Sequence, residues 1–282
     1  MARGATATVT VIGRTGSDDA VVPPAVAVLG LGEAGSRLAG DLAAAGAEVH
    51  GYDPAFPGDV PDAPTAVGAA DVVLSVNSAA AALDVATSVL AALRPGAIFA
   101  DLNTASPELK QEIAALVAST GARFADVALL GPVPARGLRA PVLASGDGAT
   151  AFASAFEPLG MPVEVVSSRP GDAATMKLVR SVFMKGLAAA ALESLAAAEA
   201  AGHADWLEQQ LGQVIGPDLL ARLVEGSRRH AARRADEMDA ACELLESLGI
   251  EPRVAAASRA ILAELGSSPK DREESGEHAA RR

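Results

Sequence analysis

Aromatic side chains and cysteines are scarce in this 282-residue chain. Phe, Trp and Tyr make up 3% of the residues while half of the chain is apolar, so the core must be built from Ala, Val and Leu. Cys242 is the single cysteine, which excludes an intramolecular disulfide and a cysteine-rich metal site. The four histidines show no metal-ligand spacing, so we expect no metal centre. A cytoplasmic location fits this cysteine usage.

Long uncharged apolar runs and an excess of positive charge are also lacking. The longest Ala-rich stretch, residues 186–201, contains Glu193 and Glu199, so we expect no membrane-spanning helix. The first residues show no basic segment followed by an apolar one, so we expect no signal peptide. The net charge of −12 disfavours non-specific binding to nucleic acid and to anionic membranes. The sequence therefore predicts neither as a partner.

Residues 25–53 carry the motif around which the chain is organised. The apolar run Ala25–Leu29 predicts a buried strand, and Gly30, Gly32 and Gly35 follow it in the spacing Gly-x-Gly-x-x-Gly. Residues 36–45 have the composition of a helix, and residues 48–52 that of a second strand, which ends on Asp53. A strand, glycine turn, helix, strand and terminal acid in this order predict a dinucleotide-binding site.

Each part of this motif has a physical role. Gly30 permits the turn out of the strand, Gly32 lets a pyrophosphate approach the backbone, and Gly35 lets the helix pack on the strand. Asp53 would accept hydrogen bonds from ribose hydroxyls and repel a 2′-phosphate, so the sequence favours NAD over NADP. Together with residues at the end of the following strand, the predicted cofactor-binding residues are Gly30, Leu31, Gly32, Glu33, Ala34, Gly35, Tyr52, Asp53, Val76 and Asn77.

Strand and helix patterns alternate from residue 25 to about residue 167, which predicts a parallel sheet with helices on both faces. After residues 168–171 only helical patterns follow, the first of which covers about thirty residues from Asp172. We therefore predict an α/β Rossmann dinucleotide-binding domain over residues 25–168 and an all-helical substrate and dimerisation domain over residues 169–266. Residues 1–24 are expected to form a flexible extension and residues 267–282 a disordered tail.

The long helical pattern places Lys177, Ser181 and Lys185 at i, i+4 and i+8, along one stripe. The residues around Lys177 are mostly apolar. A lysine in such surroundings either extends its ammonium group to water or enters a site, where a low dielectric brings its pKa towards neutrality. In the second case it can take a proton from a substrate hydroxyl. The residues alone leave both possibilities open.

Over roughly residues 25–265 the chain resembles the β-hydroxyacid dehydrogenases, which include 6-phosphogluconate and 3-hydroxyisobutyrate dehydrogenases. The resemblance lies in the glycine motif of residues 30–35, in Asp101-Leu-Asn-Thr-Ala-Ser-Pro107, in residues 126–134 and in the segment from Gly171 to Lys177. The sequences of residues 129–134 and 177–186 resemble those of a subgroup that has a distinct helical C-terminal domain of unknown function.

The resemblance implies roles for individual residues. Lys177 would be the general acid/base, Asn103 would contact nicotinamide or substrate, and so would Thr104. Two positions depart from the family pattern: Leu130-Gly131-Pro132 replaces a serine before paired glycines, and Ser181 replaces an asparagine. Lys185 or Arg136 could then supply the cation for a substrate carboxylate. Asn103 thus joins the cofactor-binding residues, and the predicted substrate-binding residues are Asn103, Thr104, Gly131, Ser181 and Lys185.

These observations favour an NAD-dependent dehydrogenase of small 3-hydroxy acids. The long Ala- and Leu-rich helix offers more apolar surface than one small domain needs, which favours a homodimer. One alternative is a reductase of imines or of another carbonyl-like substrate, since imine reductases share the architecture, although they usually lack the lysine. A non-catalytic NAD-binding protein is a further alternative. The basic cluster between Arg228 and Arg234 has the pattern of a solvated, salt-bridged helix face, with an anion site as the alternative.

Overall fold

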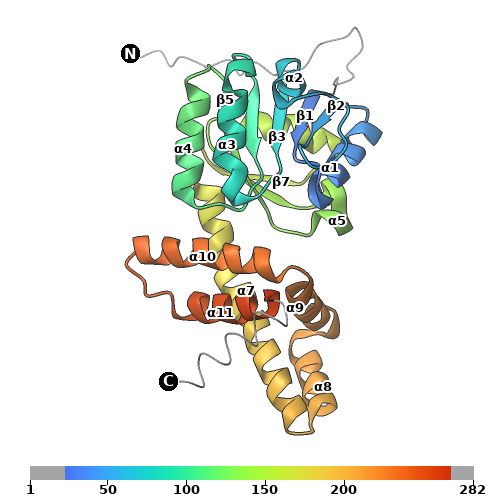
Figure 1. The fold of residues 1–282 in the computed structure, drawn as a ribbon, viewed down its shortest axis with the longest axis vertical. Helices are drawn as coiled ribbons and strands as arrows, with labels where there is room; N and C mark the ends of the chain where they lie inside the picture. The colour runs from blue at the N-terminus through green and yellow to red at the C-terminus, as the bar shows by residue number, and fades with distance from the viewer. Residues whose placement is uncertain (1–22, 268–282) are drawn as a thin grey trace, which may run out of the picture. The chain divides into compact units, whose positions relative to one another are not determined.

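The computed structural model describes residues 23–267, which form two compact units that divide after Ala174 (Figure 1). The division falls six residues after the boundary expected from the sequence at residue 168, because the first turn of a long helix belongs to the first unit. The expected extension and tail lie outside the described residues, apart from positions 23, 24 and 267. The α/β domain followed by a helical region confirms the predicted fold class.

The first unit is built on a seven-stranded sheet in the order β2-β1-β3-β4-β5-β6-β7. The strands are β1 (Ala25–Leu29), β2 (Glu48–Tyr52), β3 (Val72–Ser75), β4 (Ile98–Asp101), β5 (Arg123–Leu129), β6 (Val142–Ser145) and β7 (Val163–Ser167). All neighbours are parallel except β5 and β6, which corrects the expectation of a wholly parallel sheet. The connection between these two strands contains only short helical turns, whereas a parallel pair needs a longer crossover.

Helices cover both faces of this sheet. They are α1 (Glu33–Ala44), α2 (Ala63–Gly68), α3 (Ala79–Val89), α4 (Pro107–Ala118), α5 (Val133–Arg136) and α6 (Ala149–Phe156), with 3-10 turns at Leu90–Ala92, Gly137–Arg139 and Glu157–Leu159. Val26 and Val28 of β1 pack in a cluster with α1 and α6, whereas Ala27 and Leu29 pack with α2, α3 and α4. The alternation of side chains along a strand thus builds two separate cores.

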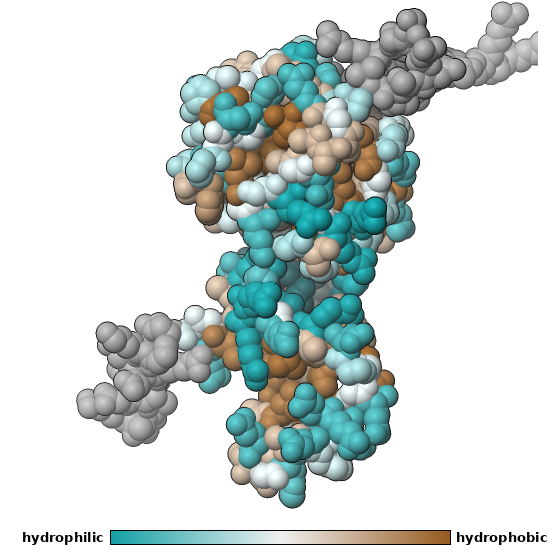
Figure 2. Space-filling model, turned by 90° about the vertical axis from the view of Figure 1, so that its right-hand side faces the viewer, coloured by the Kyte–Doolittle hydropathy of each residue, from teal (hydrophilic) through white to brown (hydrophobic). Residues whose placement is uncertain are grey.

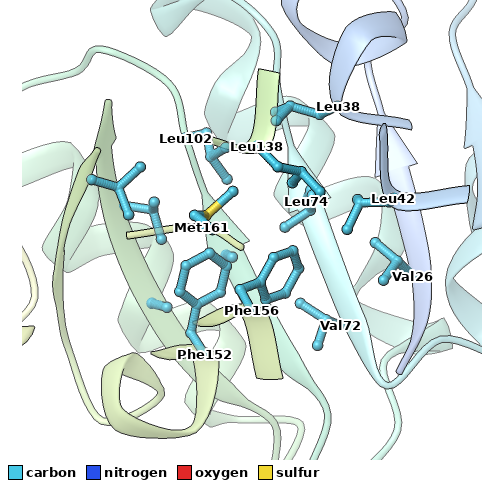
Figure 3. Packing of buried hydrophobic residues seen from close by; sticks show 14 of the residues in the cluster. Val26, Leu38, Leu42, Val72, Leu74, Leu102, Leu138, Phe152, Phe156 and Met161 are labelled. Atoms are coloured by element: carbon cyan, nitrogen blue, oxygen red, sulfur yellow. The ribbon is translucent and has the colours of Figure 1, made fainter. Parts of the chain in front are cut away.

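The few aromatic side chains of the first unit are concentrated in these cores. Phe152 and Phe156 of α6 stack with ring centroids 4.4 Å apart, and Figure 3 shows them among Val72, Leu74 and Met161. Phe99 and Phe124 are buried on the opposite face of the sheet. The remaining volume is filled by Ala, Val and Leu, as the composition requires.

The second unit is helical. It contains most of α7 (Asp172–Ala200), followed by α8 (Ala204–Ile215), α9 (Pro217–Arg229), α10 (Ala231–Ser247) and α11 (Arg253–Gly266). One core joins Leu178 of α7 to Met238 of α10 and Leu262 of α11, and a second joins Ala191 of α7 to Leu220 of α9. Successive segments of α7 therefore serve as the centre of two helix clusters.

Among residues 23–267, α7 is the one helix long and apolar enough to cross a membrane, by length and composition alone. Only 28% of its most apolar 18-residue window is buried within the chain. Exposed apolar side chains are accordingly present on the helical unit, and Figure 2 shows apolar surface between hydrophilic groups there. Ser181 and Lys185 of α7 form polar contacts with α10, as expected for the central helix of a folded domain.

Candidate functional site

The glycine turn joins β1 to α1 at the point where the strand order reverses. Gly30 has a φ of +103°, and a Cβ there would clash with the carbonyl oxygen of Val76 and lie 2.7 Å from Oδ1 of Asn77. A Cβ on Gly35 would overlap the carbonyl oxygen of Gly30. Both glycines are therefore required by close contacts within the first unit. Because β1 lies between β2 and β3, this turn occupies the crevice where open α/β sheets bind ligands.

Gly32 is different, because a Cβ there would meet nothing within 4 Å. Its φ of −65° is also accessible to any residue. Gly32 is the N-cap of α1, yet no side chain caps the helix there. The open space beside Gly32, at the positive end of the helix, fits the approach of a pyrophosphate to the backbone.

Asp53 follows β2 and holds the glycine turn. Its Oδ2 accepts a 2.7 Å hydrogen bond from the backbone nitrogen of Leu31, while Oδ1 accepts from the nitrogens of Ala55 at 2.7 Å and Phe56 at 3.2 Å. A carboxylate has about four acceptor positions, and Asp53 is only half-buried, so capacity remains for ribose hydroxyls.

The charged side chains in the segment just after Asp53 are both acidic. Asp59 accepts a 2.5 Å hydrogen bond from the backbone nitrogen of Gly51, and Asp62 caps α2 by accepting from Thr65. Burial works to raise the pKa of Asp59, but this backbone bond and the neighbouring His50 outweigh it and lower the pKa. No Lys or Arg occurs between Arg37 and Arg94. This stretch therefore offers no cation to a 2′-phosphate.

The predicted residues Asn77 and Asn103 meet at the ends of β3 and β4. Oδ1 of Asn103 accepts from the backbone nitrogen of Asn77, and its Nδ2 donates to Ser75 Oγ at 3.0 Å and to Asp101. The Nδ2 of Asn77 donates to the same hydroxyl at 3.0 Å. The Asn103 side chain is buried and forms internal bonds, so it fixes the loop that carries Asn77. Its predicted contact with nicotinamide or substrate stays a prediction.

A buried ion cluster lies beside these residues. The Nζ atom of Lys110 lies 2.9 Å from Oδ2 of Asp101 and 3.3 Å from Oδ1 of Asp126, and it donates to the carbonyl oxygen of Asp101. Burial by itself would lower the pKa of Lys110, but the two carboxylates outweigh this effect and raise it. One pattern in the sequence could have identified Lys110, because it lies on the same face of α4 as the apolar residues Ile113 and Val117.

The same cluster holds the beginning of α7. Oδ2 of Asp126 accepts from the backbone nitrogen of Ala174 at 2.9 Å and from Ser145 Oγ at 3.1 Å. Ser145 Oγ in turn accepts from the nitrogen of Ala173 at 3.0 Å. Two backbone groups in the first turn of the helix are thus satisfied by buried side chains. Polar contacts therefore continue from Asn77 through Lys110 to the first turn of α7.

In the second unit, Ser181 and Lys185 contact Glu237 of α10. Lys185 Nζ lies 2.9 Å from Oε2 of Glu237, and Ser181 Oγ donates to Oε1 at 2.5 Å. Burial works to raise the pKa of Glu237, but the charges of Lys185 and Lys177 and these hydrogen bonds lower it to about 2. Burial lowers the pKa of Lys185 despite the Glu237 carboxylate, and Arg234 adds to this effect. Glu237 lies among several acidic residues, and nothing in the sequence distinguished it.

Side chains of the basic cluster between Arg228 and Arg234 differ in their exposure. Arg233 is exposed, whereas Arg234 donates to Ser227 Oγ at 2.7 Å and to the carbonyl oxygen of Leu223. A Cβ on Gly226 would lie 2.5 Å from the Arg234 guanidinium, so this side chain packs directly on α9. Burial lowers the pKa of Arg234. The cluster therefore contains one structural arginine, which the pattern of a solvated face did not predict.

The other predicted residues are distributed over both units. Leu31, Ala34 and Val76 pack partly buried against the sheet core, Tyr52 packs against the opposite core, and Glu33 is exposed. Thr104 and Gly131 are half-buried, near the ends of β4 and β5. Lys177 is half-buried in the second unit, one turn before Ser181. Within residues 23–267, no group of three or more His, Cys, Asp or Glu side chains is arranged to hold a metal ion.

Two family models match the chain. Residues 25–153 match the NAD binding domain of 6-phosphogluconate dehydrogenase, and residues 198–265 match a domain of unknown function, DUF1932. An uncharacterised 28.5 kDa protein of Methanothermus fervidus is 32% identical over 177 residues, which are 62% of this chain and 66% of that protein. A probable 3-hydroxyisobutyrate dehydrogenase of Mycobacterium tuberculosis is 34% identical over 139 residues, 44% of this chain and 47% of the relative. The matches thus span less than two thirds of these curated relatives.

Solved structures cover more of the chain. A conserved hypothetical protein of Sinorhizobium meliloti has a TM-score of 0.67 and 29% identity, covering 86% of this chain and 88% of that one. Mycobacterium tuberculosis 3-hydroxyisobutyrate dehydrogenase has a TM-score of 0.71 at 22% identity, covering 86% and 93%. An imine reductase from Pseudomonas has a TM-score of 0.60 at 20% identity, covering 86% and 92%. The last two likenesses concern the fold.

Proposed function

Since this chain belongs to the family that joins the NAD binding domain of 6-phosphogluconate dehydrogenase to a DUF1932 domain, we propose that it is an NAD-dependent oxidoreductase. Its substrate would be a small 3-hydroxy acid. The proposal rests above all on Gly32, a glycine that the first unit itself does not need but that a pyrophosphate would.

We propose that the glycine turn and Asp53 hold the dinucleotide. Backbone groups at Gly32 and the beginning of α1 would face the pyrophosphate, while Asp53 would accept from the adenosine ribose. The preference for NAD over NADP is supported by Asp53, Asp59 and Asp62 in a segment that has no Lys or Arg. Solved structures of similar fold include complexes with NADP+ and with NADPH, so this preference needs its own measurement.

Lys177 would be the general acid/base. Bound NAD supplies a hydride acceptor, and oxidation of a hydroxyl also requires that its proton be removed. Lys177, in its neutral form, would take that proton and return it in the reverse reaction. Glu237 lies close enough for its charge to interact with that of Lys177.

Substrate contacts are proposed for Asn103, Thr104, Gly131, Ser181 and Lys185. The hydroxyl of Ser181 already donates to Glu237, and the ammonium of Lys185 is paired with the same carboxylate. Either residue would have to share its polar group between Glu237 and a substrate. Arg136, which is exposed, is the other cation proposed for the substrate carboxylate.

We also propose a homodimer in the cytoplasm. Met176, Val179 and Phe183 of α7 are 46%, 49% and 69% exposed, and their spacing of i, i+3 and i+7 puts them on one face. A second copy of the chain would bury this face. Neither nucleic acid nor membrane is proposed as a partner, in keeping with the net charge of −12.

The test begins with titration of the purified protein with NADH and NADPH, followed by nicotinamide fluorescence. Stronger binding of NADH and NAD reduction with one of a series of 3-hydroxy acids would support the proposal. The Lys177→Met variant should keep NADH binding and lose turnover, while Arg180→Met, an exposed cation on the same helix, should keep both. Failure to bind either nucleotide would refute the proposal. Turnover of cyclic imines alone would establish the reductase alternative, and binding without any turnover the non-catalytic one.

A further inference from the structure

Phe56 is the one aromatic side chain counted as exposed in the described part of the first unit, with 53% of its surface accessible. The other phenylalanines of that unit, Phe99, Phe124, Phe152 and Phe156, are buried in its cores. Phe56 thus differs from every other phenylalanine of the first unit. A single exposed apolar side chain is ordinary by itself, so a ligand is indicated only by where Phe56 is attached.

The loop that carries Phe56 is fixed at several points. The backbone nitrogen of Phe56 donates to Oδ1 of Asp53 at 3.2 Å, and the other oxygen of the same carboxylate holds Leu31 of the glycine turn. Further along, the backbone nitrogen of Asp59 donates to the carbonyl oxygen of Gly51 at 3.2 Å. A Cβ on Gly58 would clash with that same carbonyl oxygen, so the loop lies directly against β2. The exposure of Phe56 therefore does not reflect a loosely attached segment.

One carboxylate thus joins the glycine turn to the backbone of Phe56. In the proposed function, Asp53 holds the adenosine ribose, and adenine is attached to that ribose. An aromatic ring on a residue bonded to the same carboxylate is within reach of the base, and every base offers a π-face for stacking. The surrounding loop provides Ala55 and Pro57 as small apolar neighbours and carries no cation.

We infer that Phe56 stacks on the adenine ring of the dinucleotide and so contributes to its affinity. This inference rests on the proposed binding of NAD, but it can fail separately. The phenyl ring would lose its exposure to water when the base covers it, and the adenine would lose one hydrated face. The expected share of the affinity is that of one base-stacking contact, on the order of tenfold in the dissociation constant.

The experiment compares NADH with reduced nicotinamide mononucleotide, which lacks the adenosine, by nicotinamide fluorescence at concentrations up to millimolar. Phe56→Ala should weaken NADH binding on the order of tenfold and ADP-ribose binding to a similar degree, measured by calorimetry. Binding of the mononucleotide should be unchanged. Phe56→Trp should bind NADH at least as well as the wild type, and Phe56→Leu should lie closer to Phe56→Ala. Val165→Ala, which trims another exposed apolar residue of the first unit, is the control and should bind like wild type.

The outcomes separate the two proposals. If the wild type binds neither NADH nor ADP-ribose, the proposed function is refuted. If the wild type binds NADH and Phe56→Ala binds it equally well, only the role of Phe56 is overturned. Equal weakening of NADH and of the mononucleotide would also overturn it, since the substitution would then act on the whole site and not on the adenine.

Discussion

The Asp53 carboxylate accepts a 2.7 Å hydrogen bond from the backbone nitrogen of Leu31, inside the glycine turn. The acid at the end of β2 therefore has a structural role before any ligand binds, because it fixes the loop between Gly30 and Gly32. The sequence motif marks Asp53 as a ribose-binding residue. Its contact with Leu31 means that the proposed ribose-binding side chain also holds the loop proposed to face the phosphates.

Substitution of two glycines of the motif should affect different properties, stability at Gly35 and NADH binding at Gly32. Gly35→Ala places a Cβ onto the carbonyl oxygen of Gly30, so α1 must shift and the unfolding midpoint in urea should fall clearly. Gly32→Ala meets open space and should leave that midpoint unchanged or slightly raised. NADH affinity should nevertheless fall at least tenfold in Gly32→Ala, since a methyl group would occupy the pyrophosphate position. Equal loss of stability in both variants would contradict this division of roles.

Removing Lys110 should destabilise the first unit severely. Lys110→Met leaves Asp101 and Asp126 buried without their counterion, which typically costs about 3–5 kcal/mol. Chemical denaturation followed by circular dichroism would measure this loss. The control is Arg253→Ala, which breaks an ion pair with Glu251 whose side chains are 80% and 70% exposed, and should change stability by less than about 1 kcal/mol. A Lys110→Met protein as stable as the control would show that the buried pair is dispensable.

Glu237 should make stability depend on pH in the acid range. Its pKa is about 2 in the folded chain and 4.5 is its ordinary value, so the folded state stabilises the ionised form. This contribution, on the order of 3 kcal/mol, is present above pH 4.5 and is lost as the pH falls towards 2. Glu237→Gln should therefore differ from wild type most at neutral pH, and the difference should shrink on acidification. With Glu251→Gln, an exposed control, no such trend is expected. A difference independent of pH would mean that Glu237 is not ionised in the fold.

The exposed face of α7 should decide the oligomeric state. Phe183→Glu puts a charge on the face formed by Met176, Val179 and Phe183, at its most exposed residue, so the proposed dimer should dissociate. Light scattering after size exclusion would give a monomer mass for this variant and a dimer mass for wild type. Val165→Glu, on β7 of the first unit, should leave the wild-type mass unchanged. A wild-type monomer would remove the proposal of a dimer through this face.

Local patterns in the sequence were sufficient to predict most of the fold. The buried strands are short apolar runs in the sequence. Residues that begin or end helices act on their neighbours in the chain, so α4 begins after Ser106 as expected. The direction of β6 was not predictable in this way, because it depends on the length and path of the connection from β5. The one-turn helix α5 and the short α2 are too brief to produce a periodic pattern.

The site was predictable where one chain segment carries it. Gly30, Gly32, Gly35 and Asp53 could be predicted because their spacing is fixed by a single βαβ unit, and their binding of a dinucleotide stays a prediction. Lys110 and Glu237 were missed, since each is defined by partners on other elements: Asp126 is 16 residues from Lys110, and Lys185 is 52 residues from Glu237. The pairing of Ser181 and Lys185 with Glu237 likewise depends on how α7 packs against α10, which no spacing within α7 reveals.

The first turn of α7 sets where the chain can be cut. Asp126 and Ser145 bind the backbone nitrogens of Ala174 and Ala173, which belong to the first turn of α7 and are the last residues of the first unit. A nucleotide-binding fragment that ended at residue 168 would take one backbone donor from each of these two buried acceptors, although every strand would be present. Anyone expressing the first unit alone should therefore keep the chain beyond Ala174, with a further helical turn to hold that segment in place.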